Sequence, residues 1–190
     1  MEKQRFKILI ADDDDIARDV ITTLLSREGY AVLSAIDGLE AIDRLKEEKV
    51  HMVITDLQMP GANGIEVLKY AVRSDPDLAV VILTAYGTLD TALEAITEGA
   101  YDYLTKPFKT LEISILAERA YQRALLIADN RELRKNLQDT YHDLELLKAV
   151  AGSNDPGVTS NWLERIEKLK SLNVLSPQEA EALSEKLIKG

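Results

Sequence analysis

The amino-acid sequence predicts an α/β protein with a doubly wound, five-stranded parallel sheet, followed by a long α-helix and a small helical C-terminal segment. Three observations indicate this arrangement. Short apolar runs alternate with segments of helical period over the first hundred residues. Residues 109–151 contain neither glycine nor proline, and two short amphipathic segments close the chain.

The five apolar runs are rich in Val, Ile and Leu, and they predict strands at residues 8–11, 31–35, 52–55, 79–83 and 101–104. Runs that are apolar at nearly every position are typical of strands buried on both faces of a parallel sheet. The segments between them predict helices at residues 16–27, 39–46, 65–72 and 89–96. Gly29 and Gly99 stand where helices should end, and Pro76 follows a third helix end. This pattern predicts right-handed crossovers, and the strand order that we expect for such a five-stranded sheet is the flavodoxin-like order 2-1-3-4-5.

Ligands of such sheets bind at the carboxyl ends of the strands, where the strand order reverses. The polar residues just past the predicted strands are Asp12, Asp13, Asp56, Thr84 and Lys106. Three neighbouring carboxylates repel one another unless a cation joins them, and Mg²⁺ prefers such oxygen ligands. A carboxylate beside the metal can attack a phosphoryl group, while the lysine and threonine bind the new charge. The pattern therefore predicts a phosphate-accepting switch.

Four separated segments carry a family resemblance: ILIADDDD (8–15), VITDLQMPGANG (53–64), VVILTAYG (80–87) and GAYDYLTKPF (99–108). In order and spacing they resemble the receiver domain of bacterial two-component response regulators, most closely the nitrogen-regulation class. The resemblance covers residues 4 to about 125.

The resemblance implies that Asp56 is the phospho-acceptor and that a sensor histidine kinase or phosphotransfer protein supplies the phosphoryl group. Asp13 and Asp56 would bind Mg²⁺ directly, together with the backbone carbonyl of Gln58. Asp12 would hold a metal-bound water, and Lys106 would pair with the phosphoryl group.

The resemblance also implies a switch. Thr84 would move to the phosphoryl oxygen, and Tyr103 would swing into the vacated space. The peptide bond between Lys106 and Pro107 would be cis, and Gln58 and Tyr86 would tune the rate of dephosphorylation. The chain would catalyse only its own phosphotransfer and autodephosphorylation.

Other polar residues are expected to be structural. Asp15 is interpreted as the N-cap of the helix at residues 16–27, and Asp14 as a solvated loop residue. His51 and His142 are interpreted as packing or surface residues.

The expected domains are a receiver at residues 1–122, an extended last helix at 109–151, a flexible linker at 152–160 and a two-helix segment at 161–190. The helix carries a heptad pattern, whose core positions are Leu126, Leu133, Thr140 and Leu147 in one set and Asn130, Leu137, Leu144 and Ala151 in the other. It predicts a coiled-coil homodimer, although the helix could instead fold back on its own C-terminal helices. Ser176 is expected to cap the last helix. The last 28 residues weakly resemble the SHOCT-type module, which usually has a glycine at the position of Asn173.

Charge and composition narrow the function further. The net charge is −10, of which residues 1–108 contribute −9, residues 109–150 none and residues 151–190 −1. This argues against nucleic acid as the main ligand and favours an unidentified downstream protein. The absence of cysteine excludes disulfides and thiol chemistry, and no apolar run predicts membrane insertion, so we expect a cytoplasmic protein. Two alternatives are a transcriptional regulator with a small DNA-binding C-terminal part and a haloacid-dehalogenase-type phosphatase using the aspartate run at residues 12–15.

Overall fold

The computed structural model describes residues 2–85, 87–150, 156–172 and 174–189. Tyr86, Ala151, residues 152–155 of the expected linker, and Asn173 therefore lie outside the described residues. The chain divides into two compact units, Met1–Ile127 and Ala128–Gly190.

The first unit contains one sheet of five parallel strands in the order β2-β1-β3-β4-β5, which confirms the predicted topology. The strands are β1 (Lys7–Ala11), β2 (Ala31–Ala35), β3 (Met52–Asp56), β4 (Ala79–Thr84) and β5 (Asp102–Thr105). The three inner strands are buried along almost their whole length, whereas the edge strands β2 and β5 are only partly buried. This difference explains why the run that predicts β5 is the weakest in the sequence.

The helices of this unit are the short 3-10 turn η1 (Lys3–Arg5) and the α-helices α1 (Asp15–Arg27), α2 (Gly38–Glu47), α3 (Gly64–Ser74) and α4 (Leu89–Thr97), together with the part of α5 (Thr110–Val150) up to Ile127. Gly29 and Gly99, which follow α1 and α4, have φ angles of 92° and 96°. An L-residue rarely adopts this left-handed conformation, so glycine favours the end of each helix.

One capping prediction is wrong. Asp14, not Asp15, is the N-cap of α1, and its side chain accepts hydrogen bonds from the backbone N–H groups of Ile16 and Ala17. Asp15 lies in the first turn, where it pairs with Arg18. A negative charge stabilises both positions, because the first turn of a helix exposes unpaired N–H groups.

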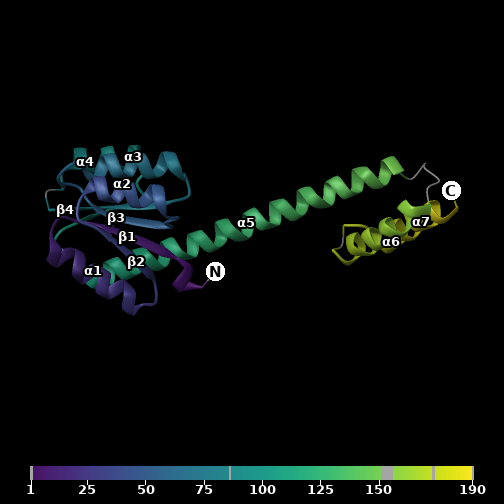
Figure 1. Ribbon diagram of the computed structural model, residues 1–190, viewed down its shortest axis with the longest axis horizontal. Helices are drawn as coiled ribbons and strands as arrows, with labels where there is room; N and C mark the ends of the chain where they lie inside the picture. The colour runs from purple at the N-terminus through teal and green to yellow at the C-terminus, as the bar shows by residue number, and fades with distance from the viewer. Residues whose placement is uncertain (1, 86, 151–155, 173, 190) are drawn as a thin grey trace. The chain divides into compact units, whose positions relative to one another are not determined.

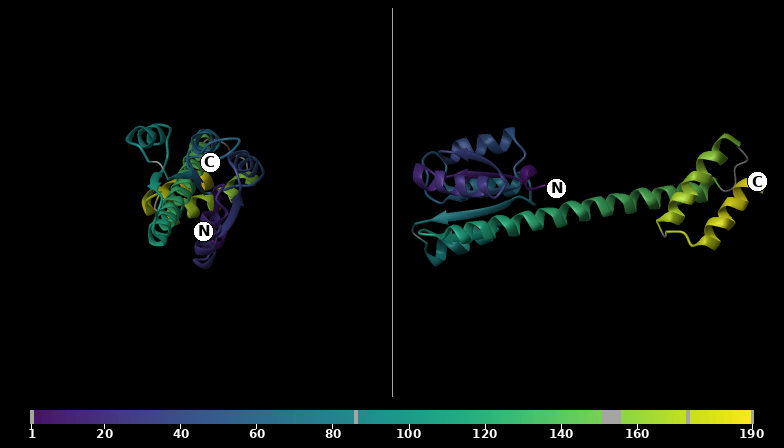
Figure 2. Two further views of the ribbon diagram at one scale, coloured as in Figure 1. Left: turned by 90° about the vertical axis from the view of Figure 1, so that its left-hand side faces the viewer. Right: turned by 90° about the horizontal axis from the view of Figure 1, so that it is seen from below.

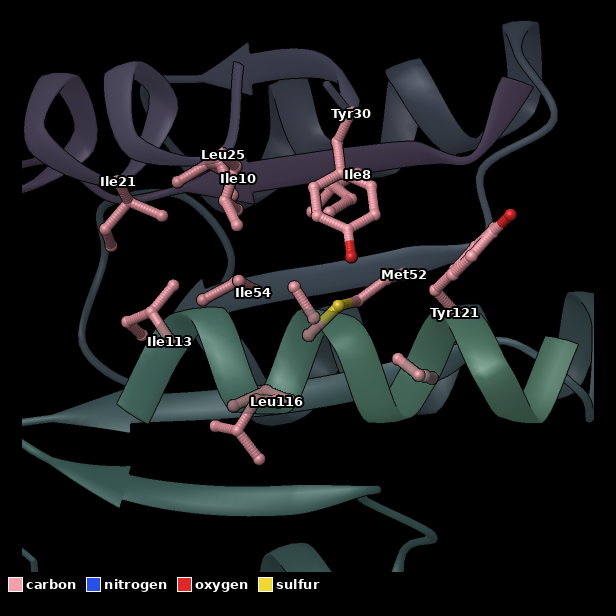
Figure 3. Packing of buried hydrophobic residues seen from close by; sticks show 14 of the residues in the cluster. Ile8, Ile10, Ile21, Leu25, Tyr30, Met52, Ile54, Ile113, Leu116 and Tyr121 are labelled. Atoms are coloured by element: carbon pink, nitrogen blue, oxygen red, sulfur yellow. The ribbon is translucent and has the colours of Figure 1, made fainter. Parts of the chain in front are cut away.

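Two apolar layers cover the sheet, one on each face (Figure 1). Helices α2, α3 and α4 pack on one face, against residues such as Leu9 and Val53. Helix α1 and the start of α5 pack on the other face. Figure 3 shows this second layer, in which Ile10 and Ile54 of the strands face Ile113 of α5. Each fully buried side chain of this size contributes about 1.5–3 kcal/mol to folding, so the two layers hold the strand ends in fixed positions.

Helix α5 runs without a break from Thr110 to Val150, as the lack of glycine and proline predicts (Figure 2). In the second unit, α6 (Pro156–Ser171) and α7 (Pro177–Lys189) lie side by side. Their contact buries Ile166, Leu169 and Ala180.

Helix α6 differs from the prediction, which has a linker up to residue 160 and a helix from Trp162. It begins at Pro156, so residues 156–160 are helical. Proline suits the first position of a helix, because its missing N–H would have no partner there. Helix α7 begins as expected: the Ser176 hydroxyl accepts a hydrogen bond from the backbone N–H of Glu179, whose carboxylate accepts one from the N–H of Ser176.

Among the residues that the structure describes, no helix combines the length and the apolar character needed to cross a membrane.

Candidate functional site: a half-buried lysine between two aspartates

The site lies at the carboxyl edge of the sheet, where the parallel strands all end. Asp12 directly follows β1, Asp56 and Thr84 are the last residues of β3 and β4, and Lys106 directly follows β5. Strand register fixes their relative heights, since Asp56 pairs with Leu83 and Thr84 with Thr105. The fold therefore brings together residues up to 94 positions apart in the sequence.

The ammonium group of Lys106 joins two carboxylates. Its Nζ atom lies 2.8 Å from Oδ2 of Asp12 and 2.7 Å from Oδ1 of Asp56. Asp12 is completely buried and Asp56 is 6% exposed, so water screens these contacts only weakly. Three charged groups thus form one compact cluster at the sheet edge.

Backbone groups hold the second oxygen of each carboxylate. Oδ1 of Asp12 accepts a hydrogen bond from the N–H of Asp14 at 3.0 Å, and Oδ2 of Asp56 accepts one from the N–H of Gln58 at 2.8 Å. Each aspartate is therefore fixed by the loop that follows it as well as by Lys106. The Lys106 backbone is positioned too, because its N–H donates to the carbonyl of Thr84 at 2.7 Å.

Burial and neighbouring charges together raise the pKa of both Asp12 and Lys106. Burial raises the pKa of Asp12, and this effect outweighs its hydrogen bonds to Lys106 and to the N–H of Asp14. Burial lowers the pKa of Lys106, but its hydrogen bonds and charge interactions with Asp12 and Asp56 raise that pKa above its ordinary value. Lys106 therefore stays charged, and additional positive charge nearby would stabilise the ionised form of Asp12.

The peptide bond between Lys106 and Pro107 is cis, as the family resemblance implies.

Asp13 lies outside the cluster. It is exposed and lines an open groove of about 790 Å³ together with Gln58 and Lys69. The described residues contain no group of three or more acidic or histidine side chains already arranged around a metal position. The structure thus brings Asp12, Asp56 and Lys106 into contact and leaves Asp13 exposed beside Asp12 in the chain.

Thr84 and Tyr103 both lie close to Gly87. A Cβ atom built on Gly87 would lie 3.6 Å from Cγ2 of Thr84 and 3.6 Å from Cε1 of Tyr103. It would also lie 2.7 Å from Cγ2 of Thr105, which is closer than carbon atoms approach. Any larger residue at position 87 would therefore collide with Thr105, close to the two expected switch residues.

Two further residues contact the site or its neighbours, and the sequence analysis missed both. The Arg18 guanidinium donates a hydrogen bond to the backbone carbonyl of Asp12 at 2.6 Å. The Thr91 hydroxyl hydrogen-bonds the Tyr103 hydroxyl at 2.9 Å. Arg18 lies six residues after Asp12, whose carbonyl it binds. Neither helical nor strand periodicity predicts a contact at that spacing. Thr91 does carry a signal, since Thr88 and Thr91 have the spacing of a capping box.

His51 is a packing residue, as predicted. Its ring stacks on Phe6 with 5.3 Å between centroids, and its Nδ1 atom accepts a hydrogen bond from the backbone N–H of Lys7 at 3.0 Å. His142 is exposed on α5.

Comparison with known proteins assigns this arrangement to a family. The response regulator receiver domain matches residues 8–118, more than half of the chain. The C4-dicarboxylate transport transcriptional regulatory protein DctD of Rhizobium meliloti is 31% identical over 140 residues, which cover 74% of this chain and 30% of DctD. The chain thus spans about a third of the length of this relative.

Two solved structures are also similar. NtrX from Brucella abortus shares 33% identity with a TM-score of 0.63, and the match covers 68% of this chain and 29% of NtrX. The beryllofluoride-activated NtrC4 receiver domain dimer shares 29% identity with a TM-score of 0.58, and the match covers 61% of this chain and 96% of that domain. The similarity to NtrX agrees with the nitrogen-regulation class. The chain belongs to the response regulator receiver domain family.

Proposed function

We propose that this chain is a two-component response regulator that accepts a phosphoryl group on Asp56 and passes the signal to a downstream protein as a homodimer. The donor is a phosphohistidine on a sensor histidine kinase or phosphotransfer protein. The observation that carries the proposal is the bridge from Lys106 Nζ to Asp12 and Asp56, at 2.8 and 2.7 Å.

The transfer step needs a carboxylate oxygen held beside a fixed positive charge. An Asp56 oxygen attacks the phosphorus atom, and a P–O bond forms as the P–N bond to the donor histidine breaks. The electron pair of that bond stays on the imidazole nitrogen. Lys106, already 2.7 Å from Asp56, offsets the charge that accumulates on the phosphoryl oxygens. Attack of water on the acyl phosphate releases inorganic phosphate and returns Asp56 to its starting form, so the only residue that the chain modifies is its own aspartate.

The acidic residues suit a Mg²⁺ ion. They offer hard oxygen donors, and one lysine leaves the charge of two aspartates only partly balanced. Asp13, Asp56 and the Gln58 carbonyl would hold the ion, with Asp12 acting through a water. The raised pKa of Asp12 supports this, because its charged form gains from nearby positive charge. The ion would supply positive charge that offsets the repulsion between these acids and an incoming phosphoryl group.

The response to phosphorylation would pass through Thr84 and Tyr103. Their common position beside Gly87 supports this, because side chains packed closely around one residue cannot move independently. In the described conformation the Tyr103 hydroxyl is bonded to Thr91 of α4. A movement of Tyr103 would therefore change a contact of α4, which lies on the surface of the first unit.

The output would be a protein contact in the cytoplasm. Residues 151–190 have a net charge of −1, which does not favour binding to the phosphate backbone of DNA. The similarity to the NtrC4 receiver domain dimer supports a homodimer. A phosphatase of the haloacid-dehalogenase type would give Asp56 no role, although Asp56 contacts the only charged lysine of the described site cluster.

The test is transfer from a small phosphodonor. The full chain is incubated with acetyl phosphate and Mg²⁺, and its intact mass is measured. We expect a gain of one phosphoryl group that disappears in Asp56→Asn and on removal of Mg²⁺. Asp43→Asn, an exposed aspartate on α2, is the matched control and should gain the same mass. Equal gain in wild type and Asp56→Asn, or gain in neither, would overturn the proposal.

A further inference from the structure

The second half of α5 exposes a regular stripe of large apolar side chains. Leu126 is 70% exposed, Leu133 66% and Leu137 54%. In the first half of the same helix, Ile113 and Ala117 are buried against the sheet. The helix therefore continues beyond the receiver with apolar residues that face water, an arrangement that is costly unless another surface covers them.

The spacing of this stripe is that of a coiled coil. Leu126, Asn130, Leu133 and Leu137 are separated by four, three and four residues. This alternation places Leu126 and Leu133 at heptad position d and Asn130 and Leu137 at position a. We call these four residues the α5 seam. The sequence carries the same register on through Thr140 to Leu144 and Leu147.

The residues that flank the seam carry charges of opposite sign on its two sides. Within residues 126–150 the g positions are Asp129, Asn136, Asp143 and Val150, and the e positions are Ile127, Arg134, Tyr141 and Lys148. In a parallel dimer each g residue faces the e residue five positions later in the second copy. Both charged pairs are then attractive, Asp129 with Arg134 and Asp143 with Lys148.

An antiparallel dimer would have the opposite effect. There g positions face g positions and e positions face e positions, so aspartates would meet aspartates or an asparagine, and the bases would meet each other. Like charges placed together cost free energy and suppress that arrangement. The flanking charges therefore select the parallel orientation.

Asn130 fixes the register. In a parallel, in-register pair the two Asn130 amides lie side by side and can hydrogen-bond each other. Any other alignment buries the amide against leucine, which costs about 1–3 kcal/mol for each unsatisfied group. A polar residue at one a position lowers stability but excludes alternative registers.

We propose that residues 126–150 of two chains form a parallel, in-register, two-stranded coiled coil through the α5 seam. The occupant of the seam is a second copy of this chain, because residues 109–150 hold seven acidic and seven basic residues and the flanking charges complement themselves. This inference deepens the homodimer of the proposed function and rests on it. It adds the surface, the orientation and the register.

The natural absence of cysteine allows a direct test by cross-linking. Leu126→Cys and Leu137→Cys are made separately in the full chain and oxidised, with and without acetyl phosphate and Mg²⁺. A parallel, in-register pair brings each residue next to its own copy, within disulfide reach. An antiparallel pair has one crossing level and can bring at most one of the two positions onto itself. Lys135→Cys, at the outer position f, is the matched control.

We expect nearly complete cross-linking at both seam positions, a dimeric mass by light scattering and only background cross-linking at position 135. Reversal of one charge, Asp129→Arg, should weaken the dimer at least several-fold, and adding Arg134→Asp should restore it. Cross-linking at only one seam position would contradict the parallel orientation. A monomer under both conditions would overturn the coiled coil and favour a helix folded on its own chain. The phosphoryl mass gain at Asp56 is measured on the same samples, so a failure of the seam is distinguished from a failure of the proposed phosphorylation.

Discussion

The hydroxyl groups of Tyr103 and Thr91 lie 2.9 Å apart, so a side chain of the edge strand β5 is joined to the first turn of α4. Thr91 also forms a capping box with Thr88, the N-cap of α4. One hydroxyl thus connects an expected switch residue to the start of the neighbouring helix. Any movement of Tyr103 that breaks this bond removes a contact from the N-terminus of α4.

This connection predicts different effects for two substitutions. Tyr103→Phe removes only the bond to Thr91 and should cost about 1 kcal/mol of stability. Thr91→Val also removes half of the capping box and should cost about 1–2 kcal/mol. Urea unfolding measures both losses, and amide hydrogen exchange over residues 89–97 should quicken more in Thr91→Val. Thr97→Val, which removes a hydroxyl bonded only within α4, is the control. Identical exchange in Thr91→Val and Thr97→Val would contradict the connection.

The buried charge of Asp12 predicts that Asp12→Asn is more stable than wild type at pH 7. The folded-state pKa of Asp12 is raised, so the native state binds more protons than the unfolded state in mild acid. The ionised Asp12 carboxylate therefore lowers the free energy of unfolding at neutral pH, and this effect disappears as the pH falls through the raised pKa. We expect a gain of roughly 1 kcal/mol at pH 7, a typical single-residue effect, that shrinks towards pH 4. Thermal unfolding across this range measures it, and a variant less stable than wild type at pH 7 would refute the argument.

The buried, hydrogen-bonded ring of His51 leads us to predict a second pH dependence of stability, at a higher pH than that of Asp12. Burial lowers the pKa of its imidazole, and Nδ1 must be unprotonated to accept the hydrogen bond from the N–H of Lys7. The unfolded chain therefore takes up a proton near pH 6.5 while the native state resists it, so stability falls on acidification below that pH. In His51→Asn the slope of unfolding free energy between pH 7.5 and about 5.5 should flatten. His142→Gln, at an exposed position of α5, should keep the wild-type slope; equal slopes in all three proteins would count against this role.

The close approach of Gly38 to Ala62 predicts that a larger residue at the start of α2 displaces the loop after Asp56. A Cβ atom there would lie 2.0 Å from the carbonyl oxygen of Ala62, a backbone atom that cannot rotate away. Gly38→Ala should cost about 1–3 kcal/mol and slow the gain of phosphoryl mass from acetyl phosphate, because the loop must shift.

Gly29→Ala is the contrasting variant. Gly29 has a φ of 92° and nothing within 4 Å of its built Cβ, so this substitution should cost about 1 kcal/mol of backbone strain without affecting phosphorylation. Equal phosphorylation rates in Gly38→Ala and wild type would contradict this displacement of the loop.

The sequence predicts the sheet and most of the site, because it shows where each strand ends. Buried parallel strands are continuous apolar runs, and the polar residue that ends each run marks the carboxyl edge of the sheet. Asp12, Asp56 and Lys106 are found in this way, and the structure brings them into contact. The exposed position of Asp13 cannot be predicted from the sequence, because adjacent residues in a loop can point in different directions.

The remaining features depend on information that periodicity does not carry. Two aspartates stand at the start of α1, and only the backbone conformation decides that Asp14 is the cap. The N-terminal turn shows the same limit. Lys3 contacts Glu118 at 2.7 Å and lies over the ring of Tyr30, which requires a tertiary position that no local pattern specifies. The roles of Thr84, Tyr103 and the metal ligands stay predictions of the family resemblance.

The most direct test of the central claim is the chemical location of the phosphoryl group. The full chain is phosphorylated with acetyl phosphate and Mg²⁺, reduced with borohydride, which converts an aspartyl phosphate to homoserine, and cleaved with trypsin. The peptide of residues 50–69 contains one aspartate, Asp56. We predict homoserine at position 56 of this peptide, dependent on Mg²⁺. Homoserine at position 12 or 13, or none in the chain, would contradict the assignment of Asp56 as the phospho-acceptor.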